Sequence, residues 1–325
     1  MSLAIPAFAD LTKATRTVLY GDVAGDGAFA PGLTQVKANT VTADGVILNI
    51  KAAVSQAGVV SPSLTTMYSP NSNLMLMGIF GAGGSVTGSA TLSNVLRVPG
   101  LQATLTATPP LLSQPPMQSV TVDYVTPTAR LRAVATPADA SEPLSAPPKC
   151  ELSATTAIGA CVLGGKVAAD AANGKLSQWS LGATWTRMVA EEGKGVVGGL
   201  SGQQWGAMVT DNAPGSSASS AAARSATFSF HQLLHGGETS LAAEYSMPLA
   251  PPGNTPDHNY ALSLGAARRL DTGGLLKTRL DHTGQVSLLY QQAVPGMGQL
   301  ALSCQLDPLS LTKVAPSVGF SLSVA

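Results

Sequence analysis

The last ten residues of the chain, PSVGFSLSVA (316–325), carry the pattern that decides the fold. Apolar side chains alternate with small ones, which is the two-residue period of a β-strand with one apolar face and one polar face. The apolar set is Val318, Phe320, Leu322 and Val324, and the other set is Ser317, Gly319, Ser321 and Ser323. Since neither set carries a charge, the stretch predicts a strand whose polar face is neutral.

The composition of the whole chain favours a membrane protein. Charged residues make up 11% of the 325 residues, where a soluble domain averages about 25%. The mean hydropathy is +0.22, yet no apolar run approaches the roughly 20 residues of a membrane-spanning helix. A membrane β-barrel fits both facts because its strands place apolar residues only at every second position. A soluble β-sandwich or β-helix with a weakly charged surface is the alternative.

Similar strand patterns fill the C-terminal third of the chain. Alternation over 240–247, 260–264, 285–291 and 299–306 predicts strands of about ten residues or fewer, the length of a tilted membrane strand. The stretch PGMG (295–298) has the composition of a turn between two of them. Three segments rich in Pro, Ser and Ala read as exposed loops within one fold: 136–149, 211–223 and 248–258. The expected organisation is therefore an all-β barrel of antiparallel strands joined by short turns.

The first residues differ in kind from the rest. An apolar side recurs at helical spacing between about Ala7 and Tyr20, after Pro6, which suits a first helical turn. Its members are Phe8, Leu11, Thr15, Val18 and Leu19, and the opposite side carries Asp10, Lys13 and Arg16. Three glycines then end the helix and form a flexible hinge: Gly21, Gly25 and Gly27. We therefore divide the chain into a helix with its hinge (1–27) and a barrel (28–325).

Signals for other functions are weak. Lys and Arg together number 18, as do Asp and Glu, so nothing indicates a nucleic-acid partner. The three cysteines, Cys150, Cys161 and Cys304, lack the spacing of a disulfide framework or a zinc site. The N-terminus lacks a basic region followed by an apolar core, which predicts a protein inside the cell. No nucleophile elbow, phosphate-binding loop or dinucleotide motif occurs, so we expect no catalytic residue, no metal, no cofactor and no enzyme.

The stretch IPAFADLTKATRTVLYGD (5–22) resembles the opening of the voltage-dependent anion channels, the mitochondrial porins. Their helix carries a Tyr/Phe-Ala-Asp-Leu-x-Lys-x-x-Arg pattern, which is filled here by Phe8, Ala9, Asp10, Leu11, Lys13 and Arg16. RVPGLQATLTATPP (97–110) looks like the strand that holds the family's Gly-Leu-Lys motif. Similarity continues through 157–165 and is best over 238–325.

The resemblance implies a barrel of nineteen strands whose first and last strands pair in parallel, with the amphipathic helix inside the pore. It implies voltage-gated, passive diffusion of ATP, ADP, phosphate, organic anions and small ions across the mitochondrial outer membrane. Membrane lipid is the implied surrounding, and a homo-oligomer or association with other membrane complexes is open. The outer envelope of a plastid is the alternative location.

Candidate pore-lining and gating residues follow from the resemblance for the helix and from local alternation near the C-terminus. On the helix they are Asp10, Lys13 and Arg16, with both cations facing the pore. Near the C-terminus, Lys277, Arg279 and Asp281 alternate with uncharged residues, which predicts that they line the lumen together.

Two positions depart from the family's pattern. The motif that contacts nucleotides falls at Gly100, Leu101 and Gln102, so glutamine stands where the family has lysine. A membrane-facing glutamate of several members falls near Gly78. Together with the net charge of zero, the first departure predicts weak anion preference. Two other functions stay open: the barrel subunit of the outer-membrane protein-import translocase, and a structural barrel with a docking role.

Overall fold

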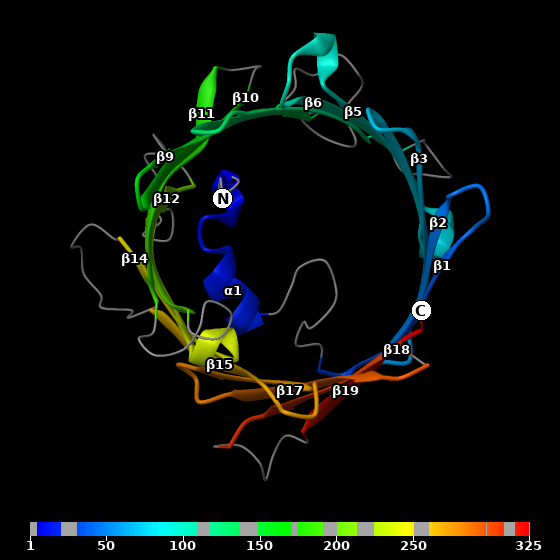
Figure 1. Cartoon of the computed structure of the whole chain (residues 1–325), viewed down its shortest axis with the longest axis vertical. Helices are drawn as coiled ribbons and strands as arrows, with labels where there is room; N and C mark the ends of the chain where they lie inside the picture. Colours follow the sequence, from blue (N-terminus) through cyan, green and yellow to red (C-terminus); the bar gives the residue numbers. More distant parts are fainter. Residues whose placement is uncertain are drawn as a thin grey trace.

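The computed structural model describes residues 5–20, 31–108, 117–136, 149–170, 174–190, 200–212, 224–249, 260–296, 298–308 and 316–324. Nineteen strands form one closed sheet, and a short helix lies within the ring of strands (Figure 1). The predicted hinge glycines Gly21, Gly25 and Gly27 lie outside the described residues, as do most residues of the three predicted loops.

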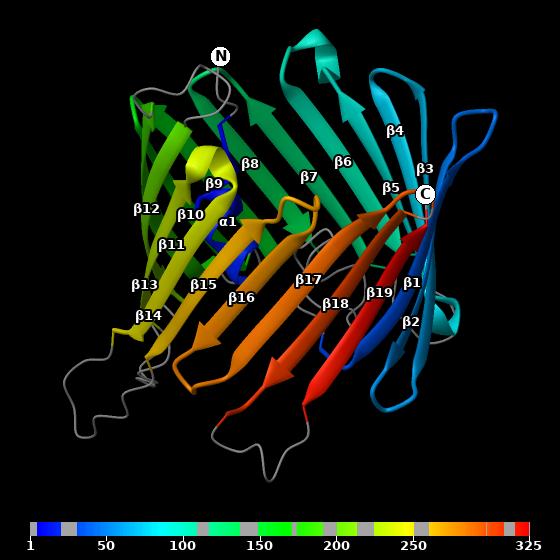
Figure 2. The same cartoon turned by 60° about the horizontal axis from the view of Figure 1, so that its bottom comes forward.

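The strands follow one another along the chain with tilted, antiparallel neighbours (Figure 2). The first ten are β1 (Leu33–Val41), β2 (Ile47–Ser55), β3 (Val60–Asn71), β4 (Leu74–Phe80), β5 (Val86–Ser93), β6 (Leu101–Thr108), β7 (Met117–Val125), β8 (Ala129–Thr136), β9 (Lys149–Ile158) and β10 (Cys161–Asp170). The others are β11 (Lys175–Ala190), β12 (Leu200–Asp211), β13 (Arg224–Leu234), β14 (Thr239–Pro248), β15 (Ala261–Arg269), β16 (Leu275–Asp281), β17 (Val286–Val294), β18 (Gly298–Leu306) and β19 (Ser317–Val324).

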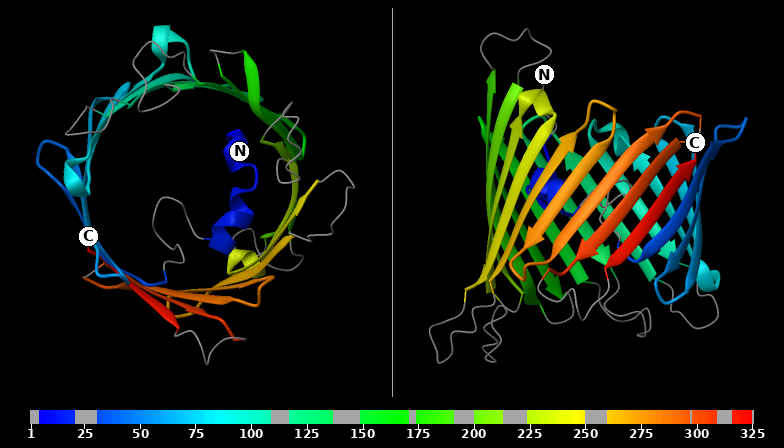
Figure 3. Two further views of the ribbon diagram at one scale, coloured as in Figure 1. Left: turned by 180° about the vertical axis from the view of Figure 1, so that it is seen from behind. Right: turned by 90° about the horizontal axis from the view of Figure 1, so that it is seen from below.

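The barrel closes where β19 meets β1. The two strands pair in parallel, with Thr34 opposite Phe320 and Ala38 opposite Val324. An odd number of strands requires one parallel pair, because neighbours that alternate in direction leave the first and last strands running the same way. The closing strand is therefore the alternating segment at the C-terminal end of the chain, and Figure 3 shows it beside the first strand.

The two faces of the sheet differ in polarity as the alternation predicts. Val318 is 62% exposed on the outer face, whereas its neighbour Gly319 is buried. On β18 the outer Leu302 is 43% exposed and the inner Ser303 is buried. Large apolar side chains thus cover the outside of the barrel, which is the arrangement that contact with lipid requires.

The N-terminal segment is not the single helix that the sequence predicts. A 3₁₀ turn spans Phe8–Asp10, and the α-helix α1 spans only Lys13–Tyr20. Because Pro6 has no N–H and Ala7 is extended, the first helical bonds run from Asp10 N to Ala7 O and from Leu11 N to Phe8 O, which is the tighter 3₁₀ pattern. Within the described residues, no helix has both the length and the hydropathy to cross a bilayer.

Candidate functional site

The N-terminal segment lies along the inner wall of the barrel, against β9 and β10 at its start and β13 to β16 at its end (Figure 1). The predicted apolar side faces that wall: Phe8, Leu11, Thr15, Val18 and Leu19 are all buried, Leu19 completely. The helix is thus bound to the wall through the apolar side that its sequence pattern defines.

Glycines on the inner wall make room for this side. A Cβ added at Gly164 would lie 2.8 Å from Phe8 Cδ2, and one at Gly265 would lie 2.8 Å from Leu19 Cδ2. At Gly182 the added atom would be 3.2 Å from Leu11 Cδ1. Since real Cβ atoms are essentially never found below 3.0 Å, the helix approaches the wall as closely as it does because these positions lack side chains.

Two polar contacts fix the segment along its length. Thr155 Oγ1 on β9 donates a hydrogen bond of 2.8 Å to the carbonyl of Pro6. Lys277 Nζ on β16 donates one of 3.1 Å to the carbonyl of Thr17. The second contact brings a cation to the last turn of the helix, where unsatisfied carbonyls favour positive charge.

Tyr20 joins the end of the helix to three strands. Its hydroxyl donates to Glu244 Oε1 at 3.0 Å and lies 3.4 Å from Ser263 Oγ. The guanidinium groups of Arg279 and Arg16 lie 5.4 and 5.8 Å from the centre of the Tyr20 ring, within the range of a cation–π interaction. Burial raises the pKa of Tyr20 above its ordinary value, so the hydroxyl keeps its proton at neutral pH and acts as a donor.

The structure brings most of the predicted pore residues to this region. Arg16 Nε lies 4.0 Å from Glu244 Oε2, and Asp10 and Lys13 form a pair of 3.9 Å on the exposed side of the segment. Lys277 and Arg279 face the lumen and touch α1. Asp281 shares their face, but its carboxylate accepts hydrogen bonds from the backbone of Thr283 and Gln285 in the turn after β16. Asp281 thus shapes a turn at the rim.

Cations outnumber carboxylates on the inner face of the described strands. The register of the sheet places Lys37, Lys51, Arg130, Arg132, Lys149, Lys166, Arg269, Lys277 and Arg279 on this face, with Asp123, Glu151, Glu244 and Asp281. Asp123 accepts from Arg130 Nε at 2.9 Å, and Glu151 lies 2.7 Å from Lys166 Nζ. The strand-borne carboxylates other than Asp281 thus each lie near a cation.

Lys37 and Lys51 are wall residues that sequence reasoning missed. They stand directly opposite each other on β1 and β2, an arrangement that costs stability because like charges repel. Alternation within TQVKANT (34–40) and LNIKAAV (48–54) could have placed each lysine on the polar face. Only the pairing register shows that the two lysines are neighbours.

The three residues of the motif at 100–102 have different structural roles. Gly100 has a φ of 82°, and a Cβ there would lie 2.1 Å from the carbonyl oxygen of Val125. Leu101 faces outward opposite Tyr124, while Gln102 faces the lumen opposite Asp123. Position 102 is thus on the wall, with an amide in place of a charge.

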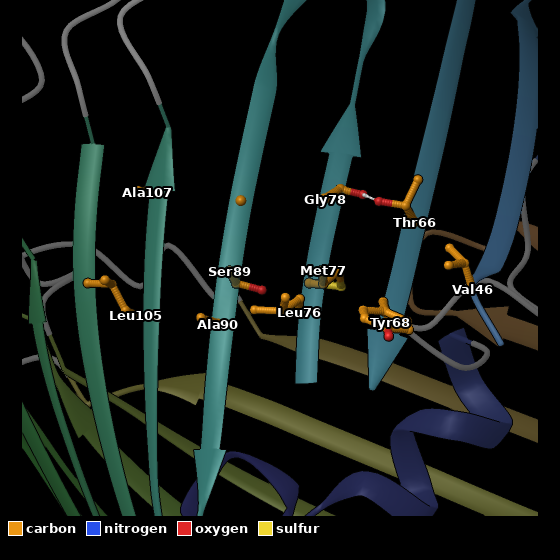
Figure 4. Close-up of a pocket in the computed structure, with 11 residues that line it drawn as sticks. Val46, Thr66, Tyr68, Leu76, Met77, Gly78, Ser89, Ala90, Leu105 and Ala107 are labelled. Carbon is orange, nitrogen blue, oxygen red and sulfur yellow. Dashed lines mark hydrogen bonds between the residues drawn. The ribbon is translucent and has the colours of Figure 1, made fainter. Parts of the chain in front are cut away.

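Gly78 lies on the outer face of β4, directly opposite Gly88 on β5. The two glycines form the floor of a hollow in the outer wall, and the Thr66 hydroxyl donates to the carbonyl of Gly78 at 3.4 Å (Figure 4). Leu76, Leu105 and Tyr68 border it. The position therefore faces the membrane with no ionisable group.

A closed barrel with an apolar exterior and a charged interior is the arrangement of a transmembrane β-barrel, the class of membrane protein to which the porins belong. The model of the eukaryotic porins matches residues 4–319 of the chain. The chain belongs to this family. Eukaryotic porins are typical of the mitochondrial outer membrane, and the protein is a non-enzymatic channel of that kind in contact with lipid.

Solved structures of bacterial porins show a distant similarity. A mutant porin of Rhodopseudomonas blastica is 11% identical with a TM-score of 0.45, and the match covers 77% of this chain and 93% of that chain. OccK10 (OpdN) of Pseudomonas aeruginosa is 12% identical with a TM-score of 0.49, covering 86% and 93%. No curated protein matches the chain.

Proposed function

We propose that the protein passes metabolites and small ions by passive diffusion, with a weak preference for anions. The observation that supports this most directly is the excess of cations over carboxylates on the inner face of the described strands. Fixed positive charge on a pore wall raises the local concentration of anions such as phosphate, ATP and ADP.

The preference is weak because long arcs of the wall are neutral. The inner faces of β3 to β6 carry Ser, Thr, Met, Ile and Gln, and those of β17 to β19 are uncharged over their described residues. Salt screens charges beyond about 8–10 Å at physiological ionic strength, so ions that pass near these arcs meet little field.

We further propose that α1 is the gating element. It carries Lys13 and Arg16, and a unit charge that crosses the membrane potential gains about 2.3 kcal/mol per 100 mV. A few hydrogen bonds, each worth about 1 kcal/mol net, are comparable with that energy. Asp10 carries a negative charge on the same segment and offsets part of the positive charge of Lys13 and Arg16. We therefore expect the channel to close at a larger voltage than it would if only the two cations moved.

Recording in a planar bilayer tests both parts. Folded protein should give channels that close as voltage rises, with a small reversal potential of anionic sign across a potassium chloride gradient. Near-ideal anion selectivity would contradict the weak preference. Persistent silence of folded protein would contradict the channel and favour a structural role in docking.

A further inference from the structure

Three methionines lie together on the inner face of β3 and β4. Met67 stands directly opposite Met77, and Met75 precedes Met77 by two residues on the same face. The pairing register shows that these methionines face the lumen. Met77 lies opposite Ser89 on β5, and Ser89 is on the same face of the sheet as Gln102 and Asp123, which face the lumen. We propose that these three thioethers form a binding site for Cu(I).

The spacing suits a single ion held by three sulfurs. Directly opposed residues have Cβ atoms about 4.5–5.5 Å apart, and residues i and i+2 lie about 6.6 Å apart along a strand at about 3.3 Å per residue. Each methionine side chain is unbranched and adapts its rotamers. Three such side chains can therefore converge on one point above the wall.

The chemistry of the cluster selects a soft, singly charged ion. Thioether sulfur is a soft ligand that prefers Cu(I), whereas Mg²⁺ and Ca²⁺ need oxygen ligands and Zn²⁺ in proteins is held by thiolate, imidazole or carboxylate. The inner-face neighbours are Ile47, Thr65, Ile79, Ser89 and Thr91, so no carboxylate, thiol or imidazole lies among them. Neutral ligands add no charge that would attract divalent cations.

The site is open to the pore. Met75 is 36% exposed, and Met67 and Met77 are half-buried. A methionine that only fills a core gap would instead be fully buried. The three cysteines, whose thiolates would also be soft ligands, face outward; Cys304, for example, lies opposite the outer Val318. An ion that enters the lumen thus reaches the methionines without meeting a cysteine on the wall.

The experiment uses the full-length protein in detergent with Cys150, Cys161 and Cys304 replaced by alanine. Cu(I) is titrated without oxygen in competition with the chromogenic chelator bicinchoninate. We expect one Cu(I) per chain and no comparable binding of Zn²⁺. X-ray absorption of the copper-loaded protein should show a shell of sulfur ligands.

Leucine variants separate the site from general binding. Met67→Leu and Met77→Leu conserve volume and should each weaken Cu(I) binding more than about 100-fold, because even residues that only orient a ligand affect affinity about 10- to 100-fold. Met208→Leu is the matched control, since Met208 is a methionine on the inner face of β12; its affinity should stay unchanged.

Two results would overturn the proposal: absence of Cu(I) binding by the cysteine-free protein, or undiminished binding by a variant with all three methionines replaced. Channel conductance of each variant, recorded without copper, shows that it is folded. Because the diffusion channel does not depend on copper, failure of this test leaves the proposed function intact.

Discussion

The hydroxyl of Tyr20 donates a hydrogen bond of 3.0 Å to Glu244, which joins the last residue of α1 to a strand 224 positions further along the chain. Arg16 lies near the same carboxylate. The end of the helix is therefore held to β14 by one half-buried tyrosine and one cation, and this contact is the first place to test how the helix moves.

Replacing Tyr20 with phenylalanine should loosen the helix. The change removes the donor to Glu244 while it keeps the ring, and hydrogen bonds to charged groups contribute about 1.5–3 kcal/mol. We expect closure at lower voltage in planar-bilayer recordings. Tyr245→Phe is the control because Tyr245 lies on the outer face of β14, the strand that carries Glu244. Equal voltage dependence in the two variants would argue against a role for the contact in gating.

A methyl group at Gly265 should displace the helix from the wall. The added Cβ would lie 2.8 Å from Leu19 Cδ2 and 3.2 Å from the carbonyl of Thr278, and Leu19 is completely buried. Overpacking of this kind costs about 1–3 kcal/mol. We expect Gly265→Ala to increase proteolysis within the N-terminal segment, whereas Gly88→Ala, with its nearest atom at 3.9 Å, should not. If the Gly265→Ala and Gly88→Ala variants were digested at the same rate, the close approach of Leu19 to Gly265 would not be what holds the helix on the wall.

Lys37 and Lys51 should contribute to selectivity at a cost in stability. Because like charges face each other across β1 and β2, Lys51→Gln should leave the barrel as stable as before or more stable by a few tenths of a kcal/mol. The same change should shift the reversal potential toward cation preference. Thermal unfolding and reversal potential measured on one preparation separate the two effects. A less stable variant with unchanged selectivity would assign the pair a structural role.

Position 102 should tune the pore in both directions. Gln102 faces the lumen opposite Asp123, which already pairs with Arg130. We therefore expect Gln102→Lys to strengthen anion preference and to increase the block of chloride current by ATP, and Gln102→Glu to do the opposite. Paired recordings of the two variants provide the comparison, and shifts of the same sign in both would contradict a lumenal charge effect.

Much of the fold follows from local patterns in the chain. Alternation over 316–325 places Val318 outside and Gly319 inside, and the spacing of Phe8, Leu11 and Leu19 defines the side of the helix that is buried. These features depend only on the two-residue period of strands and the 3.6-residue period of helices. The sequence pattern did not predict the break between the 3₁₀ turn and α1. The apolar residues recur at nearly the same spacing whether the segment is one continuous helix or a 3₁₀ turn followed by an α-helix.

The site depended on pairings that no local pattern contains. Lys277 and Arg279 could be placed on one face from the sequence, but their contacts with Thr17 and Tyr20 join residues about 260 positions apart. Asp281 lies on the same face as these two residues, yet its carboxylate accepts a hydrogen bond from the backbone of a turn. It does so because β16 ends at Asp281, and the sequence pattern does not show where the strand ends.

The sequence by itself determined which side chains face lipid and which face the pore, because that choice repeats every two residues along each strand. The tertiary structure alone decided which side chains meet across strands, as Lys37 meets Lys51 and Met67 meets Met77. It also decided which wall holds the helix, since the glycines at 164, 182 and 265 lie beneath Phe8, Leu11 and Leu19 only when the strands are in register. Register is set by turns and by closure of the whole ring, so it is a property of the complete barrel.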